Sequence, residues 1–107
     1  MSKNSDHYLA VVKKIVLQNI PKDRFNVFLF GSRTSKKHRH SSDIDIGIKG
    51  HKPIDDKVIL KIKEEIDESI VPFKVDIIDF SKVDDKFKKV ALKEYEIWNQ
   101  VKSIKIN

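Results

Sequence analysis

Apolar residues recur along the chain at two spacings, and these spacings predict helices and strands. Between residues 6 and 20 they return every three or four positions, with lysines on the opposite face, which predicts an amphipathic helix ended by the following proline. The same spacing over residues 55–69 predicts a second helix, and the acidic Asp55 and Asp56 suit its N-terminus. A third such helix is predicted over residues 84–101.

Three short segments between these helices are rich in β-branched and aromatic residues, as buried strands are. They cover residues 25–30, 43–48 and 73–80, with a loop or short helix between the first two. The resulting order predicts an α+β fold, with a small mixed sheet and helices packed on one face. A chain of 107 residues is expected to form a single domain, residues 1–107, around one modest core.

The end of the chain is expected to supply two aromatic side chains to this core, with a partner-binding stripe as the alternative. Phe87 and Trp98 lie at helical spacing in the third predicted helix, on the stripe that carries its other apolar residues. The final residues, SIKIN at 103–107, are expected to form a basic tail outside the packed elements.

Composition and charge indicate a class of partner and a cellular location. The 22 basic and 16 acidic residues leave a net charge of +6, which favours a nucleotide, a nucleic acid or an acidic protein face as partner. There is no cysteine, no apolar run long enough to span a membrane, and no apolar core of signal-peptide type at the start. A cytoplasmic protein that is not bound to a membrane is therefore expected.

Candidate chemistry lies on the strand faces that point away from the predicted core. In the second strand isoleucines alternate with Asp43 and Asp45, so both carboxylates point to the opposite face. In the third strand the same rule places Asp76 on that face and Asp79 on the core face. Carboxylates that share a face raise one another's pKa unless a cation neutralises them, and oxygen ligands favour Mg²⁺ or Mn²⁺.

A Gly-Ser pair directly follows the first predicted strand. Gly31 has no Cβ to keep phosphate oxygens away from the backbone N–H groups, and Ser32 can cap a short helix whose N-terminus attracts anions. A phosphate site beside metal-binding carboxylates predicts a nucleoside triphosphate site that performs phosphoryl or nucleotidyl transfer.

The segments GSRTSKKHRHSSDIDIGI, residues 31–48, and KVDIIDF, residues 74–80, carry a family resemblance. They resemble the minimal nucleotidyltransferases of the DNA polymerase beta superfamily, and in particular the small members paired with HEPN-domain proteins in prokaryotic toxin–antitoxin systems. The resemblance runs from about residue 8 to residue 98. It implies a palm-like nucleotidyltransferase fold, and an enzyme that transfers a nucleoside monophosphate, AMP from ATP, to a hydroxyl group on a HEPN toxin.

The resemblance also implies roles for single residues. Asp43 and Asp45 would bind two Mg²⁺ ions, with Mn²⁺ as the other candidate metal. Asp76 would complete one metal site and deprotonate or orient the acceptor hydroxyl.

The phosphate-binding part of the resemblance rests on the loop after the first strand. Gly31 and Ser32 would hold the β- and γ-phosphates, and Arg33 follows them as it does in many members. Many members then have Ala-Arg-Gly, whereas residues 34–36 here are Thr-Ser-Lys, and this departure bears on the rate of turnover more than on metal binding.

Three functions of different classes remain open at this point. The first is the enzyme just described, acting as an antitoxin, and the second is an antitoxin that neutralises its partner by binding alone. The third is a small basic nucleic-acid-binding domain, which the charge favours but the lack of exposed aromatic pairs on the strands does not. The acceptor, the preferred nucleotide and the choice between a homodimer and a hetero-oligomer are left open by the pattern.

Overall fold

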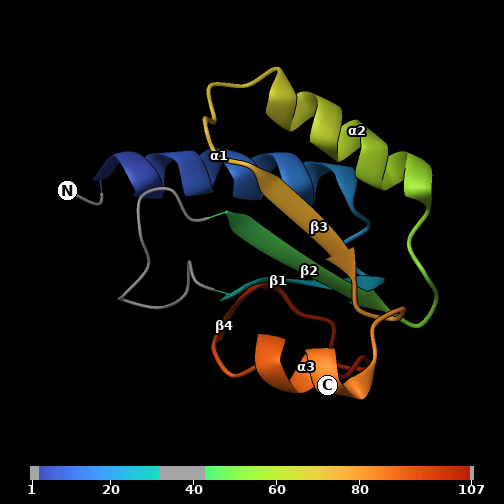
Figure 1. Ribbon diagram of the computed structural model, residues 1–107. Coiled ribbons are helices and arrows are strands. Elements are labelled where there is room, and N and C mark those ends of the chain that lie inside the picture. Colours follow the sequence, from blue (N-terminus) through green and yellow to red (C-terminus); the bar gives the residue numbers. More distant parts are fainter. Residues whose placement is uncertain (1–2, 32–42, 107) are drawn as a thin grey trace.

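The structure, a computed structural model, describes residues 3–31 and 43–106. Four strands in these ranges form one sheet in the order β3-β2-β1-β4, with helices above and below it (Figure 1). The elements are α1 Lys3–Asn19, β1 Phe25–Phe30, β2 Ile44–Gly50, α2 Asp56–Asp67, β3 Val75–Asp79, α3 Asp85–Ala91 and β4 Tyr95–Asn99. No helix in the described ranges is both long enough and apolar enough to span a bilayer.

The sheet is mixed, as the order of helices and strands predicts. β2 runs antiparallel to β1 and parallel to β3, and β1 pairs with β4 on its other side in antiparallel fashion. The parallel pair needs a crossover connection, which α2 provides. Asp55 caps that helix, since its side chain accepts a hydrogen bond from the backbone N–H of Lys57 at 2.9 Å. The predicted α+β class is confirmed.

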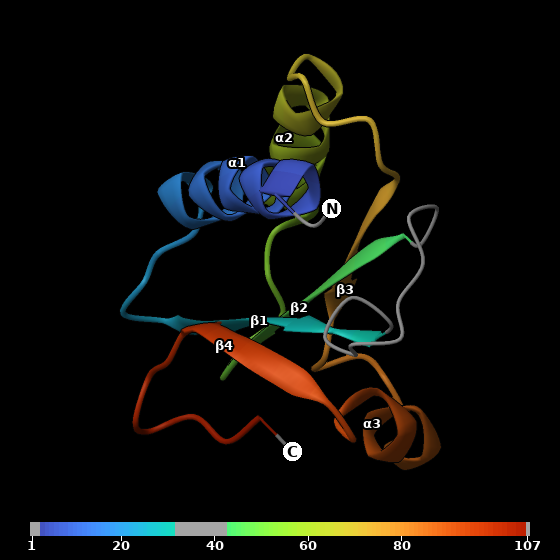
Figure 2. The ribbon, with the colours of Figure 1, turned by 90° about the vertical axis from the view of Figure 1, so that its left-hand side faces the viewer.

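One face of the sheet packs against α1 and α2 (Figure 2). Ile44, Ile46 and Ile48 of β2 are fully buried in this core, as their alternation predicts. α1 contributes Val12 and Val16 to the same cluster. The carboxylates that alternate with the isoleucines must therefore lie on the opposite face.

That opposite face carries a smaller aromatic core, which α3 covers. Phe28 and Phe30 of β1 pack with Phe80 after β3 and with Ala91 of α3. Figure 2 shows α3 on the side of the sheet away from α1 and α2. The prediction that helices lie on one face thus holds for α1 and α2 only, because the phenylalanines of β1 need an apolar cover of their own.

The prediction of one continuous helix over residues 84–101 is wrong. The helix ends at Ala91, and Tyr95–Asn99 forms β4, which pairs with the otherwise free edge of β1. Trp98 is buried in the main core as expected, but Phe87 remains 40% exposed. Tyr, Ile and Trp favour strands, and the hydrogen bonds to β1 outweigh the helical spacing of the apolar residues.

The predicted basic tail is also wrong in part, because residues after β4 are held against the sheet. Asn26 is fully buried, and its side-chain amide donates to the carbonyl of Ile104 at 2.9 Å. The backbone N–H of Val101 donates to the Asn26 Oδ1, and Ile104 is itself buried. Each of these buried polar groups therefore has a partner.

Candidate active site

Two carboxylates stand side by side on the face of the sheet opposite the isoleucines. Asp45 of β2 and Asp76 of β3 are partners in the parallel register, so their strands bring them together at the spacing of neighbouring strands. Both are partly buried, whereas Asp43, just before β2, is exposed. Strand alternation places Asp43 on the same face as Asp45.

The charges of these carboxylates act on one another. Burial raises the pKa of Asp45, and the negative charges of Asp76 and Asp43 raise it further. The positive charge of Lys74 acts in the opposite direction. Lys74 is not among the site residues predicted from the sequence, although its spacing of two from Asp76 indicates that both point to one face.

The raised pKa of Asp45 predicts how stability changes with pH. Below pH 3.8, the ordinary pKa of this carboxyl in the unfolded chain, Asp45 is protonated in both the folded and the unfolded protein. The neighbouring acids then cost the folded state nothing. As pH rises through the higher folded pKa, ionisation costs more in the folded protein, and stability is lost. The melting temperature of Asp45→Asn should therefore equal that of the wild type near pH 3 and exceed it at pH 7. The difference should be only a few degrees, because solvent screens this partly exposed group.

Thermal denaturation from pH 3 to pH 8 in EDTA tests this expectation. Asp23→Asn, at an exposed position of the turn before β1, should show no such gain at neutral pH. A melting temperature for Asp45→Asn below that of the wild type at pH 7 would contradict the assigned repulsion.

Gly31 lies directly against Asp45 from the β1 side. The strand partner of Asp45 on β1 is Phe30, and Gly31 follows it with φ +82°. A Cβ on Gly31 would lie 2.6 Å from the Oδ2 of Asp45, so this carboxylate would have to move to make room for it. Glycine is thus favoured both by the backbone conformation and by the nearby carboxylate.

The other residues predicted to bind phosphate directly follow Gly31 in the sequence. Ser32 and Arg33 lie outside the described residues, as does the departure from the family loop at residues 34–36. Their roles stay predictions.

The donor set at this site fits a hard divalent cation, because carboxylate oxygens are the ligands that Mg²⁺ and Mn²⁺ prefer. In the described ranges, no three His, Cys, Asp or Glu side chains stand close enough together to hold one ion. Asp43, Asp45 and Asp76 would have to turn toward a common point. Such a rotation is available to side chains that keep contact with solvent, as all three do.

Asp79, the fourth acid of these strands, has a structural role. It is 8% exposed, as its position on the core face predicts. Its carboxylate accepts hydrogen bonds from the backbone N–H of Ile54 at 3.0 Å and from the Ser81 hydroxyl at 2.6 Å. Asp79 therefore ties the segment before α2 to the end of β3 and does not join the other carboxylates.

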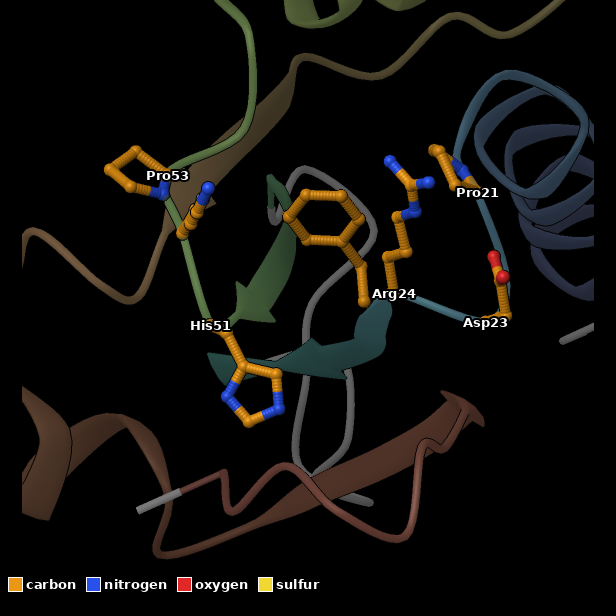
Figure 3. A pocket seen from close by; sticks show the side chains of 7 residues that line it. Pro21, Asp23, Arg24, His51 and Pro53 are labelled. Carbon is orange, nitrogen blue, oxygen red and sulfur yellow. The ribbon is translucent and has the colours of Figure 1, made fainter.

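A hollow of about 450 Å³ lies at the opposite end of the sheet from the carboxylates (Figure 3). It is lined by Pro21, Asp23, Arg24, Phe25, His51, Lys52 and Pro53. Phe25 pairs with Gly50, whereas Asp45 pairs with Phe30 at the far end of the same two strands. This hollow is therefore separate from the carboxylate site.

Comparison with known proteins identifies relatives of this chain and similar folds. The family model "Polymerase beta, Nucleotidyltransferase" matches residues 12–100. Over 89 residues the chain is 34% identical to the probable protein adenylyltransferase MntA of Haemophilus influenzae, a match that covers 83% of this chain and 76% of the relative.

Similar folds occur in solved toxin–antitoxin structures. A mutant of the MntA–HpeT toxin–antitoxin pair matches with a TM-score of 0.68 at 18% identity, over 88% of this chain and 74% of that one. The complex of tri-AMPylated Shewanella oneidensis HEPN toxin with MNT antitoxin matches with a TM-score of 0.65 at 17% identity, over 92% and 74%. A toxin–antitoxin structure with AMP-PNP gives 0.66 at 20% identity, over 84% and 71%. At such identities these structures show a shared fold.

Proposed function

The chain belongs to the polymerase beta nucleotidyltransferase family, and on that premise we propose that it transfers AMP from ATP to a hydroxyl group in a Mg²⁺-dependent reaction. The observation that carries the proposal is the pairing of Asp45 with Asp76 directly beside Gly31. The negative charges of Asp43 and Asp76 raise the pKa of Asp45, and a bound cation would offset this repulsion, which supports the proposal of a metal site.

In the proposed reaction the acceptor oxygen attacks the α-phosphorus of ATP. The bond from that phosphorus to the oxygen of the β-phosphate breaks, and pyrophosphate leaves with the bonding electron pair. Asp76 accepts or orients the proton of the attacking hydroxyl, and Gly31, with Ser32 and Arg33, binds the β- and γ-phosphates.

Asp43, Asp45 and Asp76 would hold two Mg²⁺ ions, or Mn²⁺ in their place. When bound, these ions supply positive charge that polarises phosphate oxygens and lowers the pKa of the acceptor hydroxyl. The carboxylates themselves set where that charge lies, since β2 and β3 hold Asp45 and Asp76 in fixed register.

The acceptor is proposed to arrive on a partner protein, a HEPN-domain toxin for which this chain is the antitoxin. The Haemophilus influenzae relative is named as a probable protein adenylyltransferase, and the two solved structures with TM-scores of 0.68 and 0.65 are of toxin–antitoxin pairs. Asp43 is exposed and Asp45 partly so, which leaves the site accessible to a hydroxyl on another protein. We further propose that residues 1–107 act as one domain, in the cytoplasm.

A group of exposed apolar residues on α3 and β4 suits the docking of that partner. We call it the α3–β4 patch; its members are Phe87, Val90, Tyr95 and Ile97, with exposed fractions of 40%, 68%, 44% and 37%. The rings of Phe87 and Tyr95 contact Phe30 and Phe28, which lie on the same sheet face as Asp45. A partner seated there would bring its hydroxyl to the carboxylate face, and apolar surface of this kind is typical of protein interfaces.

Val90→Asp is expected to lower AMP transfer to the partner by about tenfold or more, because a charge would be buried in the apolar interface. ATP binding in the absence of the partner should not change, since Val90 is 68% exposed on α3. Leu60→Asp is the matched control, because Leu60 is 57% exposed on α2, which covers the other face of the sheet. Equal losses in the two variants, or no loss in either, would count against this docking surface.

Incubation of the chain with its HEPN partner, Mg²⁺ and ATP labelled in the α-phosphate tests the proposed function. The label should move to the partner, EDTA should prevent the transfer, and parallel reactions with CTP, GTP and UTP should be slower. Absence of transfer with all four nucleotides would overturn the proposal.

A further inference from the structure

We propose that Lys74 binds the α-phosphate of the nucleotide, on the β3 side of the carboxylates. Lys74 is a lysine just before β3, and nothing in the family match or the relatives' names assigns it a role. This inference rests on the proposed function, since it names a further residue of the same site.

The strand register places Lys74 at the carboxylates. Its carbonyl accepts a hydrogen bond from the backbone N–H of Ile44 at 2.9 Å, and Ile44 lies between Asp43 and Asp45 in the sequence. Because Asp45 is the partner of Asp76, the same register continued by two residues brings Lys74 level with Asp43. Strand alternation directs Lys74 and Asp76 to the same face.

The positive charge of Lys74 acts on the carboxylates, but its ammonium group forms no ion pair with a described residue. Lys74 lowers the pKa of Asp45, against the effect of burial and of the neighbouring acids. In the described parts of the chain, however, the ion pairs are Lys61 with Glu65 and Lys82 with Asp56, and Lys74 forms none. Its exposed side chain is therefore free to move toward a bound anion.

A nucleoside triphosphate meets strong repulsion at this site, because its negative charges approach three carboxylates. Gly31 lies on the β1 side of Asp45, and Lys74 lies on the β3 side. If the β- and γ-phosphates lie at Gly31 and the attacking hydroxyl at Asp76, the α-phosphate lies toward β3. An ammonium group there can donate to its non-bridging oxygens, on which negative charge is concentrated during transfer.

Calorimetric titration of the chain with MgATP, without the partner, tests the proposal separately from catalysis. Lys74→Met should weaken binding by about tenfold, as expected for the loss of a hydrogen bond to a charged group at an exposed position. Lys74→Arg keeps the charge and should stay within about threefold of the wild type. Lys63→Met, at an exposed position of α2, is the control and should bind MgATP as the wild type does.

Titration of Lys74→Met with Mn²⁺ alone should not show the loss of affinity that is expected for MgATP. Without the lysine, the carboxylates carry more net negative charge, so Lys74→Met should bind Mn²⁺ as tightly as the wild type or more tightly. If Lys74 only balances charge in the folded protein, Lys74→Met will lower the melting temperature and leave MgATP binding unchanged, which overturns the inference. A wild type that binds no MgATP would instead overturn the proposed function, and this inference with it.

Discussion

The double variant Asp43→Asn, Asp45→Asn is expected to lose AMP transfer to the partner by about a thousandfold or more, while it still folds and binds the partner. Charge stabilisation by a bound metal contributes several kcal/mol to such reactions, and an amide is a much poorer ligand for Mg²⁺ than a carboxylate. Folding should survive, because Asp43 is exposed and burial already opposes ionisation of Asp45. Labelled transfer and co-purification with the partner measure the two properties separately.

The same variant separates an enzyme from a binding antitoxin. If neutralisation of the toxin depends on transfer, the double variant no longer protects cells that express the toxin, although the complex still forms. Asp67→Asn, an exposed acid of α2, should protect as the wild type does. Protection that persists in the double variant would show that binding alone neutralises the partner.

Gly31→Ala is expected to lower the rate of AMP transfer by about a hundredfold, which is the largest loss expected after that of the double variant. The backbone at Gly31 has φ +82°, which a residue with a Cβ adopts only at a cost of about 1 kcal/mol. The added methyl group would also lie 2.6 Å from the Oδ2 of Asp45, so this carboxylate must move. A displaced metal ligand and a displaced phosphate-binding turn both reduce stabilisation of the transition state, and kcat/KM for ATP measures the loss.

Gly50→Ala provides a matched control for this variant. Its methyl group would lie 2.5 Å from the Cε1 of Phe25, at the other end of the sheet. The melting temperature should fall, while transfer at 25 °C should be nearly unchanged. Loss of transfer in Gly50→Ala as large as that in Gly31→Ala would mean that Gly31 acts through general stability and not through the site.

The alternation of residues in β2 and β3 was enough to predict which face each side chain occupies. Ile44 and Ile46 are fully buried, and Asp45 meets Asp76 on the other face, because a strand with one buried face leaves its side chains no other choice. Asp79 follows the same rule into the interior.

The end of the chain could not be predicted in the same way. Phe87, Val90 and Ala91 fit a helix, and the helical pattern can be extended to Trp98. Whether Tyr95–Asn99 forms a strand depends on the free edge of β1, which becomes evident only once the sheet is assembled. The place of Lys74 level with Asp43 likewise follows from the hydrogen bond between its carbonyl and Ile44, because its spacing of two from Asp76 predicts the shared face but not the pairing of the strands.

A crystal structure of the chain with Mn²⁺ and a non-hydrolysable ATP analogue tests most directly whether the carboxylates form a metal site. Anomalous scattering should locate Mn²⁺ about 2.1 Å from oxygens of Asp43 and Asp45, with Asp76 bound to one of the ions and the triphosphate against Gly31. Manganese bound elsewhere, or Asp76 directed away from the other two carboxylates in the nucleotide complex, would contradict the proposed mechanism.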